Sequence, residues 1–279
     1  MRVHFCGVRG STPAPGAGFV RYGGSTSCLA IARDGADAPT LVLDGGTGIR
    51  RVTPLLRGEP FAGTILLSHL HWDHTHGLPF FRGGNHDDAW ASVLLPDQLD
   101  GESALEVLAR GMSPPHFPVR PDELTGHWRF EVASPGQFEA EGFTVTALEI
   151  PHKGGRTFGY RVSDGRSTLA YLPDHCPTVL GPGDDGLGAL HDAAVALAGN
   201  VDVLVHDAQL RADEVPTQAI FGHAAAEYAV SLGRTAEARR TVFFHHHPER
   251  TDDELDALAA GYAGDGNVLV ASEDLVLNL

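Results

Sequence analysis

Residues 69–74 read His-Leu-His-Trp-Asp-His and follow the apolar segment 64–67. Three imidazoles and one carboxylate within six consecutive positions form a ligand set for a metal ion. Such nitrogen and oxygen ligands suit zinc, manganese or iron, whereas copper or cluster chemistry would call for thiolates. A plain polar loop would show this spacing by chance in well under about one chain in a hundred. We therefore expect a metal-binding loop at the end of a strand.

The spacing of these residues indicates two metal ions rather than one. His69 and His71 lie two positions apart and project to the same side of an extended chain, so both can reach one ion. Asp73 and His74 follow after the chain has turned. We expect this second pair to begin a neighbouring site.

The motif resembles the signature of the metallo-beta-lactamase fold hydrolases. Polar residues that this family requires follow in the same order, at 152, 174 and 245. The resemblance implies an α/β fold, a four-layer αββα sandwich, with two divalent metal ions, zinc first and manganese or iron as alternatives. The ligands that it implies are His69, His71 and His152 on one ion, Asp73, His74 and His245 on the other, and Asp174 between them.

One of these assignments has close competitors, because His245, His246 and His247 are consecutive. The family pattern of a strand, one small or apolar residue and then His favours His245. His247 has the same strand parity and is the second choice. Metal counts on single His→Ala variants would decide between them.

The segments 6–13 and 22–28 narrow the resemblance to the branch that holds ribonuclease Z and the cyclic phosphodiesterase of the carbon–phosphorus lyase pathway. Carried over, this branch implies His223 as a general acid and Asp207 as its acidic partner. Two structural alternatives remain open, a locally satisfied His at a helix start and a capping Asp. Asp44 precedes two glycines after a short strand, and we expect it to orient a ligand His.

These groups predict a hydrolase, most directly a phosphodiesterase that cleaves a small or cyclic phosphodiester through a metal-bridging hydroxide. Asp73 and Asp174 would hold and orient the water, and His223 would protonate the leaving alkoxide. Two alternatives are a lactone or thioester hydrolase on the same metals and a non-catalytic, metal-bound accessory protein of cofactor biosynthesis.

Composition limits the partners and the location. The formal charge of −16 and the lack of a Lys/Arg cluster argue for a small-molecule substrate rather than a large nucleic acid. The chain is 42% hydrophobic but has no apolar run near 18 residues, so we expect no membrane span. Three cysteines make no disulfide framework. We expect a single domain over 1–279, a cytoplasmic location and a homodimer.

Hydrophobic patterning predicts alternating strands and helices. The loop 112–118 either overhangs the site or is an ordinary surface loop. Trp72, Phe80 and Phe81 are expected to be core or pocket wall rather than a base-stacking platform. The expected strands are 3–6, 28–33, 41–43, 64–68, 92–95, 128–132, 143–150, 158–162, 168–172, 201–205, 241–244 and 268–270, and the expected helices are 102–109, 190–197, 224–232 and 252–261.

Overall fold

The computed structural model describes residues 1–99 and 101–279, whose strands form two seven-stranded sheets. The first sheet has the order β14-β1-β2-β3-β4-β5-β6 and the second β13-β12-β11-β10-β9-β8-β7. The strands of the first sheet are β1 (Arg2–Gly7), β2 (Cys28–Ala32), β3 (Leu41–Leu43), β4 (Ala62–Leu66), β5 (Trp90–Pro96), β6 (His127–Ala133) and β14 (Val276–Asn278). Those of the second are β7 (Gly136–Ala140), β8 (Phe143–Ile150), β9 (Thr157–Ser163), β10 (Thr168–Leu172), β11 (Val203–Asp207), β12 (Thr241–Phe244) and β13 (Val268–Val270).

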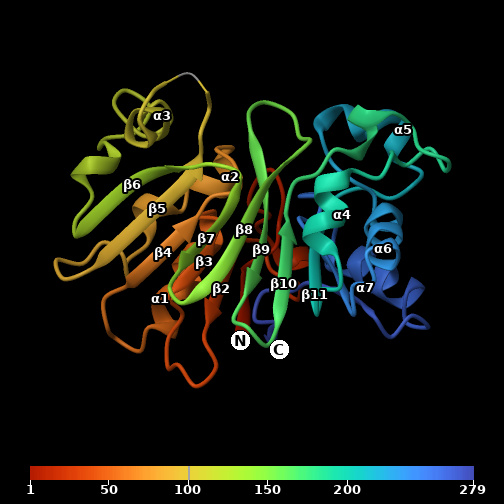
Figure 1. The fold of residues 1–279 in the computed structure, drawn as a ribbon, viewed down its shortest axis with the longest axis horizontal. Helices are drawn as coiled ribbons and strands as arrows, with labels where there is room; N and C mark the ends of the chain where they lie inside the picture. Colours follow the sequence, from red (N-terminus) through yellow and green to blue (C-terminus); the bar gives the residue numbers. More distant parts are fainter. Residues whose placement is uncertain (100) are drawn as a thin grey trace.

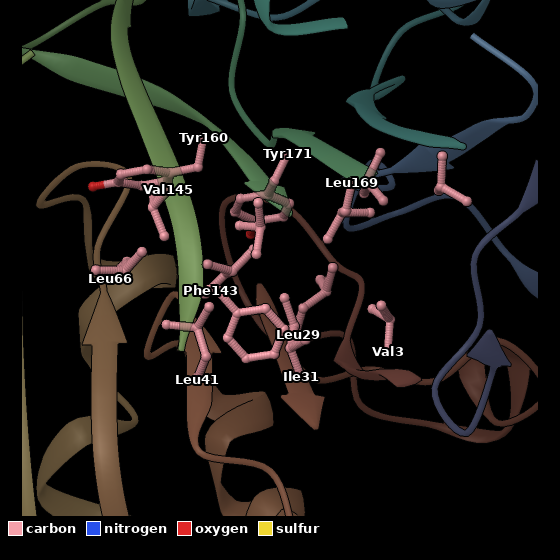
Figure 2. Close-up of a cluster of buried hydrophobic side chains, with 14 of the residues drawn as sticks. Val3, Leu29, Ile31, Leu41, Leu66, Phe143, Val145, Tyr160, Leu169 and Tyr171 are labelled. Atoms are coloured by element: carbon pink, nitrogen blue, oxygen red, sulfur yellow. The ribbon is translucent and has the colours of Figure 1, made fainter. Parts of the chain in front are cut away.

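The main hydrophobic core lies between the two sheets. Leu29, Ile31 and Leu41 of the first sheet belong to the same buried cluster as Phe143 and Tyr171 of the second, as Figure 2 shows. All five side chains are fully buried. Burial of apolar surface stabilises a fold by about 25 cal/mol per Å². Burial of this shared face is therefore the main contribution that holds the two sheets together.

Helices cover the outer face of each sheet (Figure 1), which completes four layers. The helices α4 (Asp192–Ala198), α6 (Ala226–Thr235) and α7 (Asp252–Gly261) pack on the second sheet. The first sheet is covered by α1 (Val52–Leu55), by α3 (Ala104–Ala109) and by 3-10 turns, among them η2 (Thr47–Arg51) and η3 (Leu78–Phe80). Within the described residues, no helix is long and apolar enough to cross a membrane.

The chain direction places several loops at one edge of the sandwich. Strands β3 to β6 are parallel to one another, as are β10 to β13. The predicted ligand loops follow the carboxyl ends of β4, β8, β10 and β12. Ligand sites in α/β sheets lie beyond these carboxyl ends, so the topology brings residues far apart in sequence to one place.

The expected architecture is confirmed, and so are all the expected strands and helices, some with the predicted bounds and others with shifted ends. The predicted strand 201–205 is observed as β11 at Val203–Asp207, and the predicted helix 224–232 begins two residues later. Two strands were missed. β7 is largely exposed and polar, and β14 has only three residues, so neither leaves an apolar pattern that a sequence window can detect.

Candidate metal centre

The first group of predicted ligands comes from the loop after β4 and the loop after β8. The ligand atoms of His69, His71 and His152 lie within 4.8 Å of one another. His152 donates through Nδ1 to the Gly222 carbonyl at 2.7 Å, which leaves its Nε2 free, 3.3 Å from Nδ1 of His71. The buried Nε2 of His69 has no hydrogen-bond partner. Three imidazole rings therefore converge, and one of their buried nitrogens has no hydrogen-bond partner.

The second group combines α2 (Trp72–Thr75) with the loop after β12. Nε2 of His245 lies 3.1 Å from Oδ2 of Asp73 and 3.3 Å from Nε2 of His74. His74 and His245 are fully buried, and Asp73 is 7% exposed. His71 caps the short helix with an extended backbone, and this turn separates Asp73 and His74 from His69.

Asp174, directly after β10, stands between the two groups. Its Oδ1 lies 3.5 Å from Nε2 of His152, and its Oδ2 lies 2.9 Å from Nε2 of His74 and 3.1 Å from Nε2 of His245. Oδ2 is buried and contacts only these two histidines, without a well-directed hydrogen bond. A buried carboxylate needs a cationic partner, and divalent cations at this position would satisfy it together with the orphaned Nε2 of His69. The residues present thus fit the metal ions that the sequence predicts.

Asp44 holds one of these histidines from behind. Its Oδ2 accepts from Nδ1 of His74 at 2.8 Å, from the Ser68 hydroxyl at 2.9 Å and from the Tyr171 hydroxyl at 2.8 Å. Its Oδ1 accepts from the Ser68 amide at 2.6 Å. Because Nδ1 of His74 donates to Asp44, Nε2 is the nitrogen that faces the centre and can bind a metal ion once its proton is displaced. The expectation that Asp44 orients a predicted ligand His agrees with this contact.

Two further residues support the second group and were missed in the sequence. The Ser11 backbone amide donates to Oδ2 of Asp73 at 2.6 Å. The side-chain amide of Gln209 lies 3.1 Å from Nδ1 of His245 and 3.3 Å from the Ser11 hydroxyl. Ser11 lies in the segment 6–13 that carries the resemblance, but its contact, like that of Gln209, joins residues dozens of positions apart, so no local pattern indicates either role.

The electrostatics of the first group suit metal binding. Burial lowers the pKa of His69 well below its usual value, and the neighbouring His74 lowers it further. Burial also lowers the pKa values of His71 and His152. Neutral imidazole is the form that binds a metal, so these three rings are ready for it at neutral pH.

The second group is charged in the protein without metal. Burial alone would lower the pKa of His74, but the carboxylates of Asp73 and Asp44 outweigh it and raise the pKa well above its usual value. Burial of Asp73 is likewise outweighed by His74 and His245, and its pKa falls well below the ordinary range. In the metal-free protein, the protonated histidine therefore offsets the charge of these buried carboxylates. Bound metal cations would displace the proton and take over this role.

His223 and Asp207 form a hydrogen-bonded pair beside the ligand groups. Nδ1 of His223 donates to Oδ2 of Asp207 at 3.0 Å. Asp207 is fully buried at the end of β11, and its carboxylate also accepts from the backbone amides of His175, Gln209 and Ala224. Burial opposes a charged ring, but Asp207 raises the pKa of His223 to about 9. The ring therefore carries a proton at neutral pH.

The three consecutive histidines take different directions. His245 lies in the ligand cluster, whereas His246 is buried on the other side and donates through Nε2 to the Ala271 carbonyl at 2.7 Å. His247 is half-buried and lines the outer cleft. This arrangement supports the choice of His245.

A cleft of about 510 Å³ opens over these groups. Its walls include His71, Asp73, His152, Asp174 and His223. Members of both ligand groups and His223 thus face one space. The other predicted site residues, His69, His74, Asp207 and His245, are buried and in contact with these lining residues, so six separate segments of the chain meet here.

Comparison with known proteins identifies the family. A family model described as the beta-lactamase superfamily domain matches residues 40–246, and the chain belongs to this family. A ribonuclease Z from Limosilactobacillus fermentum is 28% identical over 226 residues, covering 65% of this chain and 68% of the relative. The protein is accordingly a metal-dependent hydrolase of the metallo-beta-lactamase fold.

Three solved structures share the fold over nearly their whole lengths. The metallo-beta-lactamase fold protein YhfI from Bacillus subtilis has a TM-score of 0.71 at 19% identity, with 99% of both chains covered. A diphosphatase of the PhnP family has a TM-score of 0.66 at 17% identity, covering 100% of this chain and 97% of the other. Zn²⁺-bound PqqB from Methylobacterium extorquens has a TM-score of 0.67 at 17% identity, with 100% of both covered.

Proposed function

We propose that this protein is a dinuclear metal-dependent phosphodiesterase that acts on small or cyclic phosphodiesters. The observation that carries the proposal is the His223–Asp207 pair, which faces the same cleft as the ligand cluster. A fold built only to hold metal has no need of a buried carboxylate that keeps a cleft-lining imidazole protonated. The relative named ribonuclease Z supports the same bond class.

The metal ligands in this proposal are His69, His71 and His152 for one ion and Asp73, His74 and His245 for the other, with Asp174 shared. Both carboxyl oxygens of Asp174 face ligand nitrogens, one toward each group, which favours two ions over one. When bound, such ions activate water and stabilise negative charge on phosphoryl oxygens. Zinc is our first choice, with manganese or iron as alternatives, because His and Asp accept all three.

Asp73 and Asp174 are proposed to orient the attacking water. Each carboxylate is held in one direction, Asp73 by the Ser11 amide and Asp174 by the histidines on both sides. A held carboxylate loses little entropy when it accepts a proton or a hydrogen bond in the reaction.

His223 is proposed as the general acid for the leaving oxygen. Asp207 occupies Nδ1, so Nε2 is the atom that can hand a proton to substrate. The Asp207 carboxylate raises the pKa of His223 and so favours the protonated ring that a general acid requires. Protonation of a poor leaving group by a positioned acid is worth about 10²- to 10⁴-fold in rate.

The size and charge of the molecule favour a small substrate. The cleft measures about 510 Å³, and a net charge of −16 would repel an extended polyanion. We therefore propose a small phosphodiester rather than a large RNA, although the curated relative is named ribonuclease Z. The homodimer and the cytoplasmic location stay predictions.

The leaving group provides the test. Zinc- or manganese-loaded protein is assayed on two phosphodiesters, bis(p-nitrophenyl) phosphate and the corresponding phenyl diester. A lactone and a thioester are assayed beside them. We expect phosphodiester turnover that is lost in Asp73→Ala. We expect His223→Ala to slow phenyl esters much more than p-nitrophenyl esters, because p-nitrophenolate leaves without a proton.

Asp207→Asn should reproduce the His223→Ala pattern, and His127→Ala, an exposed histidine far along the first sheet, serves as the matched control. Metal content is measured on every variant. Turnover of the lactone or thioester without phosphodiester cleavage would contradict the proposal. Equal loss on both leaving groups in His223→Ala, with metal retained, would reject the acid role.

A further inference from the structure

A second, larger cavity lies beside the metal cleft. It measures about 990 Å³, and its lining comes entirely from residues between positions 47 and 117. Leu70 and Trp72, which flank His71 in the ligand loop, line both this cavity and the cleft. A molecule bound at the ligand cluster can therefore extend past Trp72 into the cavity.

Aromatic side chains are presented to this space rather than buried. Trp72 is 69% exposed and stacks on His76, with ring centroids 5.1 Å apart and an interplanar angle of 21°. Phe80 is 55% exposed and meets Phe117 edge to face at 5.9 Å. Phe81, by contrast, is fully buried in the core. Exposed aromatic faces around a cavity are costly in water and favour a planar apolar ligand.

The charge of the cavity is opposite to that of the molecule. The chain has 36 acidic and 20 basic residues, yet none of the described residues that line the cavity is Asp or Glu. The lining includes Arg50 and Arg82, whose side chains are exposed and have no ion-pair partner among the described residues. His76, His86 and His116 add further donors. An anionic ligand is favoured here, against the overall field of the protein.

We propose that this cavity binds the ester substituent of the substrate, and that this substituent is a planar aromatic group on an anionic molecule. The inference rests on the proposed phosphodiesterase function and adds a substrate class to it: aryl or heteroaryl phosphodiesters. The loop 112–118 supplies Met112, His116 and Phe117 to the lining, so it forms a wall of the substrate site rather than an unrelated surface loop.

The geometry assigns the cavity to the group that stays on the phosphate. His223, which protonates the leaving oxygen, comes from the second half of the chain, between η6 (Ala219–Phe221) and α6. The cavity is lined by residues of α2, η3 and α3. Figure 1 shows α2 and α3 on the side of the molecule that holds the first sheet. The leaving group and the substituent in the cavity thus lie on opposite sides of the cluster.

The first experiment compares two substrates with the same leaving group, bis(p-nitrophenyl) phosphate and methyl p-nitrophenyl phosphate. Only the retained group differs between them. We expect the wild-type protein to prefer the diaryl ester through a lower KM. Phe80→Ala and Arg82→Gln should reduce this preference about three- to tenfold, the range for loss of one aromatic contact. Trp90→Ala and Arg129→Gln, exposed on outer strands of the same sheet, are the matched controls.

The second experiment needs no turnover. Calorimetry measures binding of 1-naphthyl phosphate and of inorganic phosphate to the metal-loaded protein and its variants. We expect naphthyl phosphate to bind at least about tenfold more tightly, with the difference reduced in Phe80→Ala and Phe117→Ala and unchanged in Trp90→Ala.

The two experiments separate the inference from the proposed function. Tight naphthyl phosphate binding without phosphodiester cleavage would uphold the aromatic site and reject the proposed reaction. Cleavage of both esters with no aryl preference, or equal binding of the two phosphates, would overturn the cavity assignment and leave the phosphodiesterase standing. A preference that survives in Phe80→Ala, Phe117→Ala and Arg82→Gln would also overturn it.

Discussion

Replacing Asp44 by Asn tests how the protein keeps a ligand nitrogen available. Asp44 is fully buried, and its Oδ2 accepts three hydrogen bonds, from His74, Ser68 and Tyr171. Asparagine has the same shape, but an amide NH₂ replaces one oxygen. If the remaining oxygen still accepts the hydrogen bond from the Ser68 amide, the introduced NH₂ faces the three groups that donated to Oδ2.

Two of these donors can accept a hydrogen bond from the introduced NH₂ without cost, but the third, His74, can do so only with an effect on metal binding. The hydroxyls of Ser68 and Tyr171 rotate and accept instead of donating. His74 can accept at Nδ1 only by moving its hydrogen to Nε2, the atom that faces Asp73 and His245. A metal ion on Nε2 requires the hydrogen to be on Nδ1, where it then meets the introduced NH₂ instead of a carboxylate oxygen. Loss of such a supporting partner costs about 10- to 100-fold in metal affinity, or about 1.4–2.8 kcal/mol.

The assay is zinc competition against a chromophoric chelator, with the metal-to-protein ratio measured directly. Asp252→Asn is the matched control, because Asp252 is equally buried but accepts from the amides of Arg21 and Tyr22 and pairs with Arg9, none of which is a predicted ligand. We expect Asp252→Asn to lower stability and leave zinc affinity unchanged, and Asp44→Asn to weaken one zinc ion. Unchanged affinity for both ions in Asp44→Asn would refute the argument from the His74 hydrogen.

Three further predictions concern stability. Removing metal with EDTA should lower the melting temperature, because ions at 1,000 times their Kd contribute about 4 kcal/mol; a scan that zinc does not shift would contradict the ligand cluster. Thr251→Ala removes the reciprocal cap of α7, in which Thr251 accepts from the Glu254 amide, and should cost about 1 kcal/mol in urea unfolding. Burial lowers the pKa of His246 to about 3, so the unfolded chain binds this proton first as pH falls below about 6.5. The contribution of neutral His246 to the free energy of unfolding is therefore complete above that pH and is about 2 kcal/mol smaller at pH 5. In the metal-free protein, the stability of His246→Gln should fall less with acid than that of wild type. An equal fall in both proteins would reject the assignment.

The ligand loop and the strand pattern were readable from the sequence because both are local. The run at 69–74 carries its chemistry in six positions, and buried strands such as β3 and β12 are short unbroken apolar segments. The resemblance placed His152, Asp174 and His245 in order, and the structure gathers all three in the ligand cluster. The choice among three consecutive histidines needed coordinates, because only the left-handed backbone at His245 turns its ring toward Asp73.

The sequence by itself determined the kind of ligands, through residue type and spacing, and the resemblance of its motifs determined the family and the layered sandwich. Only the tertiary structure decided which groups support the ligands and where a substrate extends. Gln209 meets His245 and Ser11 meets Asp73 through contacts between segments that fold together from separate strands. The cavity beside Trp72 is likewise a property of packing, because its charge and shape come from side chains on several elements that no single stretch of sequence brings together.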